Sequence, residues 1–232
     1  CLFATKILTV STDMVCELKR IGNKEVTIIN NGSACGIDLD TFSKKKYINK
    51  SFRKELKIDS KDIVFVYIGR PEKRKGYNFL INLWAKNFAS QMDHKLILCG
   101  SNLEDLDKNF NKIPRNIIPL GFVENIPEIL SNSNCLILPS LHEGLSYAIL
   151  EAMACECLVI TNNIPGIKSL VQNRINGYML NVNNEIEYVT KIKSIKRDKH
   201  SQTLTKAGLK TVGKYDRKKF LKHYINFIKE LT

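Results

Sequence analysis

The sequence predicts an α/β fold built on a doubly wound parallel sheet, and three observations support this. Apolar, β-branched runs of strand length alternate with segments of helical pattern along most of the chain. The runs are continuously apolar rather than alternating, which is typical of strands whose two faces are both covered by helices. Polar and glycine residues follow most of these runs, as expected where ligands bind beyond the carboxyl ends of parallel strands.

The individual elements follow from the same patterns. The expected strands are Lys6–Val10, Val26–Asn30, Ile63–Gly69, Lys95–Gly100, Ile117–Gly121, Cys135–Pro139 and Cys157–Thr161. The expected helices are Ser11–Ile21, Tyr77–Ala89, Ile126–Ser131, Ser146–Cys155 and Ile167–Asn173. Residues 183–232 are charged and helical in pattern, with Phe220, Tyr224, Phe227 and Ile228 on one apolar face. The segment Asn30–Lys50, rich in Asn, Gly, Ser and Lys, is expected to be a linker.

Composition and charge limit the classes of protein. A chain of 232 residues with 44% hydrophobic residues can bury one sizeable core. No apolar stretch approaches the roughly 18–20 residues of a membrane span. The net charge of +13 leaves three interpretations open. The first is that lysines vary freely on the surface, and the second is that the charge favours an anionic membrane or a lipid-phosphate acceptor. The third is a nucleic-acid partner, for which no recognised motif is present.

Cysteines and the start of the chain indicate its compartment. The seven cysteines contain no C-x-x-C pair, which favours buried thiols in a reducing cytosol over a zinc site or disulfides. The first ten residues lack the basic start and cleavage site of a signal peptide. Because the chain begins at Cys1 rather than Met, we interpret it as part of a longer, cytoplasmic protein.

Two acidic residues form the first candidate constellation. Glu143 is expected in a loop after a strand, and Glu151 two turns into the following helix, so they lie up to about 12 Å apart. That separation is too long for a carboxylate pair that shares one substrate bond, but suits the two ends of one long ligand such as a sugar nucleotide. Free N–H groups near Ser146 would face its pyrophosphate, and Gly144 would allow close backbone approach. An ordinary acidic loop at a helix start is the alternative.

Two basic residues form the second constellation. Arg70 and Lys75 follow a buried strand, and Gly76 opens a helix. An Arg that donates two hydrogen bonds beside a Lys point charge suits a diphosphate leaving group. The alternative is a solvated basic turn, which is our interpretation of Lys73 and Arg74.

These residues carry a family resemblance that covers about residues 4–182. Pro139–Ser146 with Leu150–Ala154 resembles the signature of glycosyltransferase family 4, which are retaining enzymes of the GT-B fold. Gly69-Arg70 followed by Lys75-Gly76 is similar to the diphosphate motif of that family. Asn31–Asp38 with Phe42 resembles the segment that enters the C-terminal domain of members building capsular or O-antigen polysaccharide. Asn176-Gly177 also matches, whereas Cys155–Leu158 and Ser169 depart from the pattern.

The resemblance implies a role for each matching position. Arg70 and Lys75 would hold the pyrophosphate of a UDP- or GDP-linked donor, Glu143 would contact the transferred sugar, and Glu151 would bind the ribose. Gly144, Leu145 and Ser146 would offer backbone N–H groups, and Gly121 and Phe122 would border the base. Such enzymes need no metal or other cofactor, because protein cations stabilise the leaving group.

The resemblance also implies an organisation and a set of partners. Residues 1–30 would be a remnant of the N-terminal acceptor domain, 31–182 the Rossmann-like nucleotide-sugar-binding domain, and 183–232 C-terminal helices. The missing N-terminal domain would hold most of the acceptor site, so we expect little transfer by this chain alone. A glycan or lipid-linked acceptor and contact with the inner face of the plasma membrane are further expectations, and nucleic acid is not expected.

Two other functions stay open. A Rossmann oxidoreductase or sugar-nucleotide epimerase would need G-x-G-x-x-G after an early strand, and the sequence contains none there. A non-catalytic subunit or remnant that binds a sugar nucleotide is the third hypothesis. His142 is expected to be an exposed loop residue rather than a base, and Trp84 and Phe79 are expected in the core.

Overall fold

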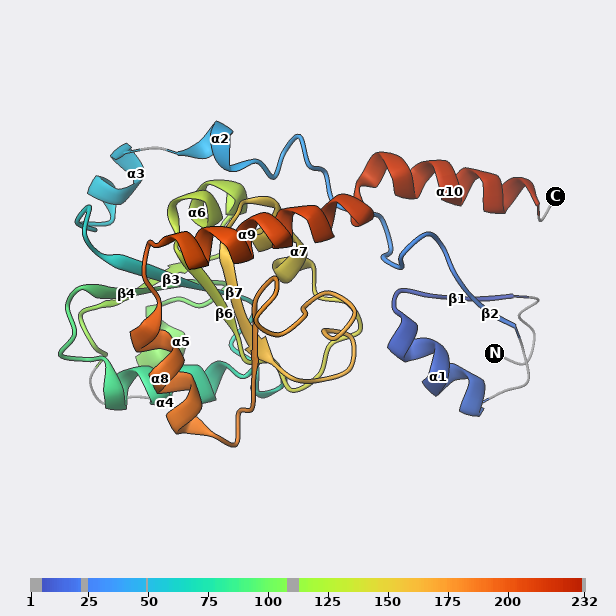
Figure 1. The fold of residues 1–232 in the computed structure, drawn as a ribbon. Helices are drawn as coiled ribbons and strands as arrows, with labels where there is room; N and C mark the ends of the chain where they lie inside the picture. The colour runs from blue at the N-terminus through green and yellow to red at the C-terminus, as the bar shows by residue number, and fades with distance from the viewer. Residues whose placement is uncertain (1–5, 22–24, 49, 108–112, 231–232) are drawn as a thin grey trace.

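The computed structural model describes residues 6–21, 25–48, 50–107 and 113–230. Within them, a six-stranded parallel sheet is covered by helices, and a separate two-stranded parallel sheet lies beside it (Figure 1). The doubly wound parallel fold expected from the sequence is therefore confirmed.

The structure gives the following bounds for the helices and strands. In chain order they are β1 (Ile7–Thr9), α1 (Thr12–Ile21), β2 (Val26–Ile28), α2 (Lys44–Tyr47), α3 (Lys50–Glu55), β3 (Ile63–Ile68), η1 (Lys73–Lys75), α4 (Tyr77–Asn87), β4 (His94–Cys99), α5 (Leu103–Asp107), β5 (Ile117–Gly121), α6 (Ile126–Asn132), β6 (Cys135–Leu138), α7 (Tyr147–Ala154), β7 (Leu158–Asn162), β8 (Tyr178–Leu180), α8 (Glu185–Ser194), α9 (Lys199–Val212), η2 (Gly213–Tyr215) and α10 (Arg217–Lys229). The η elements are single turns of 3₁₀-helix.

The order of strands in the large sheet is β5-β4-β3-β6-β7-β8. The chain enters at β3, adds β4 and β5 on one side, and then returns to add β6, β7 and β8 on the other. The winding direction therefore reverses between β3 and β6, and in open parallel sheets the crevice beyond the carboxyl ends of two such strands is the preferred place for a ligand. The loops that leave these two strands are residues 69–76 and 139–146.

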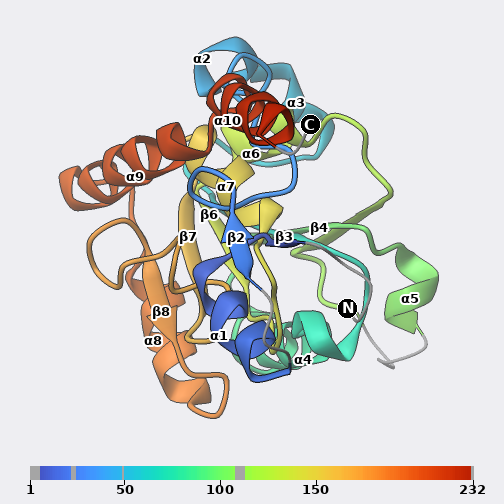
Figure 2. The ribbon, with the colours of Figure 1, turned by 90° about the vertical axis from the view of Figure 1, so that its right-hand side faces the viewer.

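Helices cover both faces of the large sheet. Helices α4 and α8 contact each other on one face, while α6, α7 and α9 lie on the other, as two perpendicular views show (Figures 1 and 2). Strand β3 lies between these layers, and its residues Val64–Tyr67 have no exposed surface. Burial of such runs from water is the main force that holds the layers together.

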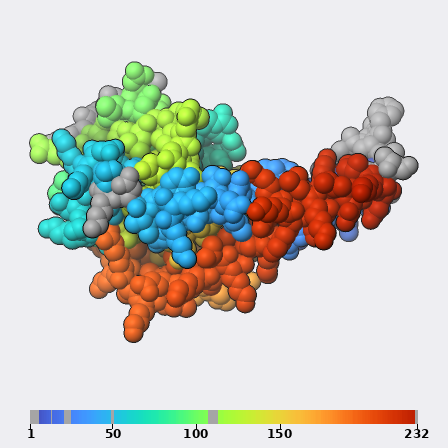
Figure 3. All heavy atoms as spheres, turned by 90° about the horizontal axis from the view of Figure 1, so that it is seen from above, coloured from blue at the N-terminus to red at the C-terminus, as the bar shows by residue number. Residues whose placement is uncertain are grey.

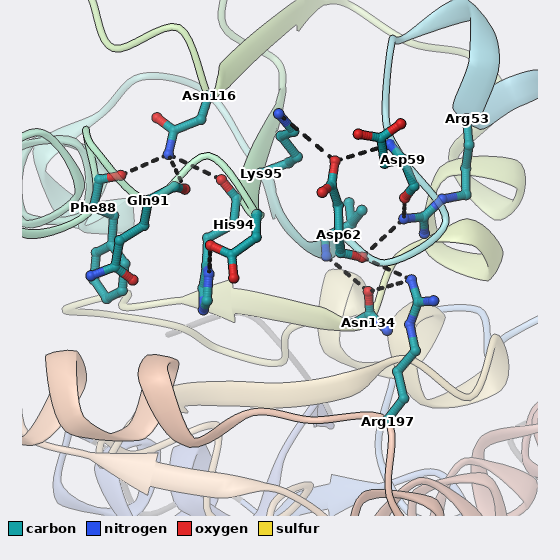
Figure 4. A network of polar contacts seen from close by, with 12 residues as sticks. Arg53, Asp59, Asp62, Phe88, Gln91, His94, Lys95, Asn116, Asn134 and Arg197 are labelled. Atoms are coloured by element: carbon teal, nitrogen blue, oxygen red, sulfur yellow. Dashed lines mark hydrogen bonds and ion pairs between the residues drawn. The ribbon is translucent and has the colours of Figure 1, made fainter.

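Aromatic packing under α4 fills one part of the core. Trp84 is fully buried, stacks on Phe88 at 4.9 Å and meets the edge of Phe65 at 5.4 Å between ring centroids. The expectation that Trp84 belongs to the core is confirmed. The buried amide of Asn116 donates hydrogen bonds to the carbonyls of Phe88, Gln91 and His94 (Figure 4), which closes the turn between α4 and β4.

Three parts of the sequence prediction differ from the structure. The helix expected at Ile167–Asn173 is wrong, because this segment forms turns. Asn176 accepts a bond from the Gln172 N–H and donates to the Leu170 carbonyl, and such side-chain bonds compete with helical ones. Strand β8 was not expected, and the expected linker contains α2 and the start of α3.

The small sheet is a compact parallel unit. Strand β1 pairs with β2 in the register Ile7 to Val26, and α1 connects them. Two neighbouring chain segments, residues 30–37 and 214–217, connect this unit and α10 to the large sheet. Asn30 and Asn31 donate to the carbonyl of Lys214, and Ile37 pairs with Asp216. Among the described residues, no helix is long and apolar enough to cross a membrane.

Replacement of Gly76 by alanine tests how closely the loops after β3 and β6 approach. Gly76 has φ +70°, and a Cβ added there would lie 2.0 Å from the carbonyl oxygen of Pro139. We expect Gly76→Ala to lower the free energy of unfolding by at least about 2 kcal/mol, from left-handed backbone strain together with overlap. Urea denaturation followed by circular dichroism measures this change.

Gly213→Ala is the matched control. Gly213 has φ −58°, and a Cβ there meets nothing within 4 Å. This variant is expected to be neutral or up to about 1 kcal/mol more stable. Equal stability of the two variants would contradict the close approach of the loops.

Candidate functional site

The loops after β3 and β6 are tied together by an ion pair. Lys75 Nζ lies 2.8 Å from Glu143 Oε1, and the same oxygen accepts a 2.8 Å hydrogen bond from Ser140 Oγ. The Glu143 side chain is only 6% exposed and that of Lys75 22%, so water weakens this pair little. The Leu141 N–H donates to the Arg74 carbonyl at 2.8 Å and fastens the two loops a second time.

Close backbone packing positions Glu143. Gly166, in the loop after β7, has φ +79°, and a Cβ there would lie 2.1 Å from the Glu143 carbonyl oxygen. Asn162, at the end of β7, donates to the Ser140 carbonyl at 3.1 Å. The loop that carries Glu143 is therefore held between the ends of β3 and β7, and its carboxylate is fixed toward Lys75.

Arg70 lies at the same edge but points to solvent. Its side chain is 76% exposed, and its Nε lies 3.0 Å from Glu72, which also binds Arg74 at 2.6 Å. The hydroxyl of Tyr67 donates a 2.9 Å hydrogen bond to the Arg70 carbonyl. Exposed ion pairs contribute little to stability, so the side chain of Arg70 can turn toward a more highly charged ligand at small cost.

Helix α7 begins at this edge. Ser146 is 3% exposed and makes no side-chain hydrogen bond that caps the helix, so the first N–H groups of α7 keep their capacity to bind an anion. The next residue, Tyr147, has another role. Its hydroxyl lies 2.6 Å from Ser33 Oγ and accepts hydrogen bonds from the N–H groups of Ala34 and Cys35.

Glu151 is a half-buried carboxyl on α7. Its neighbours Leu150 and Ala152 are fully buried, and burial raises the pKa of Glu151 to about 7. Near neutral pH a large fraction of this carboxyl is protonated, and a protonated carboxyl can donate as well as accept hydrogen bonds. That state suits a hydroxyl-bearing ligand.

Three glycines leave bare backbone at neighbouring strand ends. Gly69, Gly100 and Gly121 follow or end β3, β4 and β5, and each has a positive φ. A Cβ on Gly100 would lie 2.5 Å from the Gly69 carbonyl oxygen, and the Gly100 N–H donates to the Gly121 carbonyl at 2.6 Å. Phe122 follows with 88% of its surface exposed and offers a ring face next to this bare backbone.

The structure thus brings together some expected residues and adds others. Lys75 and Glu143 are in direct contact, whereas Arg70 contacts Glu72 instead. Ser140 and Asn162 were not assigned a role from the sequence, although both follow apolar strands at the edge where the site was sought. His142 is exposed, as expected.

Metal and thiol chemistry find little support in the described residues. No group of three or more His, Cys, Asp or Glu side chains there could hold a metal ion. Cys99, Cys135, Cys155 and Cys157 are buried free thiols, and burial raises the pKa of each, so they lack the thiolate character of reactive cysteines.

A comparison with known families decides the class. Residues 48–211 match the family "Glycosyl transferases group 1". The chain belongs to this family. The match covers all six strands of the large sheet and both loops of the candidate site.

Individual relatives agree with this family. A UDP-Gal:alpha-D-GlcNAc-diphosphoundecaprenol alpha-1,3-galactosyltransferase of Escherichia coli is 29% identical, over 88% of this chain and 56% of its own length. The capsular polysaccharide biosynthesis glycosyltransferase CapH of Staphylococcus aureus is 30% identical, over 86% of this chain and 54% of its own. The chain therefore spans about half the length of these curated relatives.

The fold also matches solved glycosyltransferase structures. That of Anabaena Alr3699/HepE in complex with UDP and glucose has a TM-score of 0.83 at 19% identity, covering 98% of this chain and 63% of the other. The Rossmann-like half of a GT-B fold expected from the sequence agrees with this likeness.

The buried carboxyl of Glu151 makes a pH-dependent prediction for this glycosyltransferase domain. Its pKa rises from 4.5 to about 7 on folding, so the folded state holds the proton more tightly between these values. The resulting stability is present below pH 4.5 and is lost as the pH rises through 7. We expect Glu151→Gln to increase the free energy of unfolding above pH 7, by up to about 3 kcal/mol, and to change it little near pH 4.5.

Urea denaturation at pH 5 and pH 8 measures the difference between the two proteins. Glu104→Gln, at an exposed position on α5, is the control and should show no such pH-dependent gain. A Glu151→Gln effect that is the same at both pH values would contradict the raised pKa.

Proposed function

We propose that this chain is the donor-binding half of a retaining family-4 glycosyltransferase of cell-surface polysaccharide synthesis. The observation that carries the proposal is the Lys75–Glu143 ion pair at the point where the winding of the sheet reverses. It joins a cation suited to a diphosphate and a carboxylate suited to sugar hydroxyls in one crevice.

The diphosphate and the sugar would occupy the two sides of this ion pair. Arg70 and Lys75 would neutralise the diphosphate as it leaves, which provides the electrostatic stabilisation of a leaving group without a metal ion. Glu143 would accept hydrogen bonds from the transferred sugar. The N–H groups of Gly144, Leu145 and Ser146, at the start of α7, would bind the sugar and phosphate oxygens.

The nucleoside would extend from α7 toward β5. Glu151, with its partly protonated carboxyl, would bind the ribose hydroxyls, and Gly121 and Phe122 would border the base. A UDP-linked donor is favoured over a GDP-linked one. The Escherichia coli relative is named for UDP-Gal, and the Anabaena structure contains UDP and glucose.

The small sheet supports the need for a second α/β domain. A two-stranded parallel sheet is unusual by itself, because parallel strands are normally part of larger sheets covered on both faces. Strand β1 leaves Leu8 44% exposed, and β2 is only half-buried. We propose that an N-terminal acceptor domain continues this sheet and that the chain alone transfers little sugar.

The relatives favour a particular acceptor and location. The Escherichia coli relative is named for a diphosphoundecaprenol acceptor and the Staphylococcus aureus relative for capsular polysaccharide. A glycan or lipid-linked acceptor at the inner face of the plasma membrane fits these names and the net charge of +13. A non-catalytic sugar-nucleotide-binding subunit remains the second candidate, because the small sheet exposes edges that a partner would have to cover.

Nucleotide binding tests the donor site. We expect saturating UDP, at about 100 times its Kd, to stabilise the chain by roughly 2.7 kcal/mol and to raise its melting temperature by several degrees. GDP and ADP should act more weakly. The UDP shift should disappear in Arg70→Ala and in Glu151→Ala, because each removes a direct contact. Lys73→Ala, an exposed cation in the same loop, is the control. No shift with any nucleotide would refute the donor site.

Transfer by a chimaera tests catalysis. The N-terminal half of the Staphylococcus aureus capsular relative, fused to this chain, is expected to transfer sugar with retained anomeric configuration, measured by NMR. Glu143→Gln in the chimaera should lower kcat by at least about 100-fold, as loss of a transition-state contact does. UDP binding without transfer would favour the non-catalytic candidate, and an inverted product would exclude retention.

A further inference from the structure

A second basic hollow lies at the opposite end of the large sheet. It has a volume of about 420 Å³ and is lined by residues that precede β3, β6 and β7, together with α2, α3 and the start of α9. The surface that carries α2, α3 and α9 is seen in Figure 3. The candidate donor site lies at the other end of the sheet, beyond the carboxyl ends of these strands. A strand of six residues is about 20 Å long, so the two places are separate.

Two arginines stand side by side in this hollow. Arg53 Nη2 and Arg197 Nη2 both donate to the carbonyl oxygen of Asp62 at 2.9 Å, as Figure 4 shows. Arg53 also donates to the carbonyls of Asp59 at 2.6 Å and Asn132 at 3.3 Å, and Arg197 donates to the Ser60 carbonyl at 2.6 Å and to Asn134 Oδ1 at 3.4 Å. Burial and then the charge of Arg197 lower the pKa of Arg53, as expected for two neighbouring guanidinium groups.

One carboxylate, that of Asp62, acts on this pair of arginines, and its charge opposes the lowering of the Arg53 pKa without cancelling it. Asp62 Oδ2 accepts a hydrogen bond from the Asp59 N–H at 2.9 Å and lies 3.8 Å from Lys95 Nζ. Its side chain is 3% exposed and therefore belongs to the interior rather than to the wall of the hollow. The two guanidinium groups are held in place by neutral oxygens and keep their positive charge.

Further cations surround the arginines. Lys44 on α2 and Lys196 before α9 also line the hollow, and neither forms an ion pair among the described residues. The acidic residues of the lining are Glu156 and Asp198, so four cations face two carboxylates, a surplus of 4 − 2 = 2 positive charges. Asp198 already accepts the Ser201 N–H at 2.8 Å as the cap of α9.

We propose that this hollow binds a phosphate-bearing anion, at a second site separate from the proposed donor site. The arginines contribute fixed positive charge with little loss of side-chain freedom, because their Nη2 groups already donate to oxygens of the chain. Lys44 and Lys196 are free to close on the ligand from two sides. A volume of 420 Å³ lies in the range of small-molecule sites. The phosphate is that of a soluble compound or of a lipid headgroup.

Pyrophosphate binding in a donor-site variant tests the proposal independently of the proposed function. In Arg70→Ala/Lys75→Ala/Glu143→Gln, which removes both partners of the buried ion pair, isothermal titration with pyrophosphate at 0.1 M NaCl should still show one binding event. Adding Lys44→Glu and Lys196→Glu should weaken it at least about tenfold, through loss of two charge-assisted contacts. Unlike the arginines, these lysines donate no side-chain hydrogen bonds to backbone carbonyls among the described residues. The variant should therefore keep its melting temperature.

The control reverses the same number of charges outside the hollow. Lys45→Glu/Lys193→Glu changes exposed residues on α2 and α8, and should weaken binding less than about threefold, because salt screens exposed charges. Equal weakening by both pairs, or loss of all binding in the folded Arg70→Ala/Lys75→Ala/Glu143→Gln variant alone, would overturn the proposal.

A vesicle experiment separates the two sources of phosphate. Co-sedimentation with vesicles of phosphatidylglycerol and phosphatidylcholine is compared with vesicles of phosphatidylcholine alone. Sedimentation that depends on the anionic lipid and on Lys44 and Lys196 supports a headgroup as the ligand. Pyrophosphate binding without such sedimentation supports a soluble compound. Absence of both kinds of binding refutes the second site.

Discussion

The contact between Lys75 and Glu143 is the constraint on which the site depends. A buried carboxylate is costly unless a cation and hydrogen bonds compensate it, and here Lys75 and Ser140 do so on one oxygen. The compensation requires the loops after β3 and β6 to lie in contact. Gly76 and Gly166 make that contact sterically possible, because both bring their backbone to positions where a side chain would collide. The charged pair and the glycines are therefore parts of one arrangement.

Much of this fold can be predicted from the sequence, because strands buried on both faces are continuously apolar. Val64–Tyr67 is such a run, and its burial is complete. Because such runs also show where each strand ends, the sequence predicted Lys75 and Glu143 as site residues from their positions in the loops that follow. Local patterns did not predict the structure where side-chain hydrogen bonds replace helical backbone bonds. Asn176 makes such bonds in the turns before β8. The pairing of Arg70 with Glu72 could not be foreseen either, since it depends on which rotamers a short exposed turn adopts.

Helix α7 connects the two proposed anion sites physically. Its first N–H groups face the crevice that contains Glu143, and Glu156, just beyond its last turn, lines the basic hollow at the other end of the sheet. Glu151 lies between them on the same helix, with a carboxyl whose charge changes near neutral pH. One short, mostly buried helix thus separates the proposed donor site at its start from the hollow beyond its end, where the acidic Glu156 opposes the binding of an anion.

The two neighbouring segments that join the small sheet and α10 to the large sheet constrain each other. Residues 30–37 and 214–217 run next to each other and are joined by the bonds of Asn30 and Asn31 to Lys214 and by the pairing of Ile37 with Asp216. Because the two segments are bonded to each other, neither can change its path without breaking these bonds or taking the other with it.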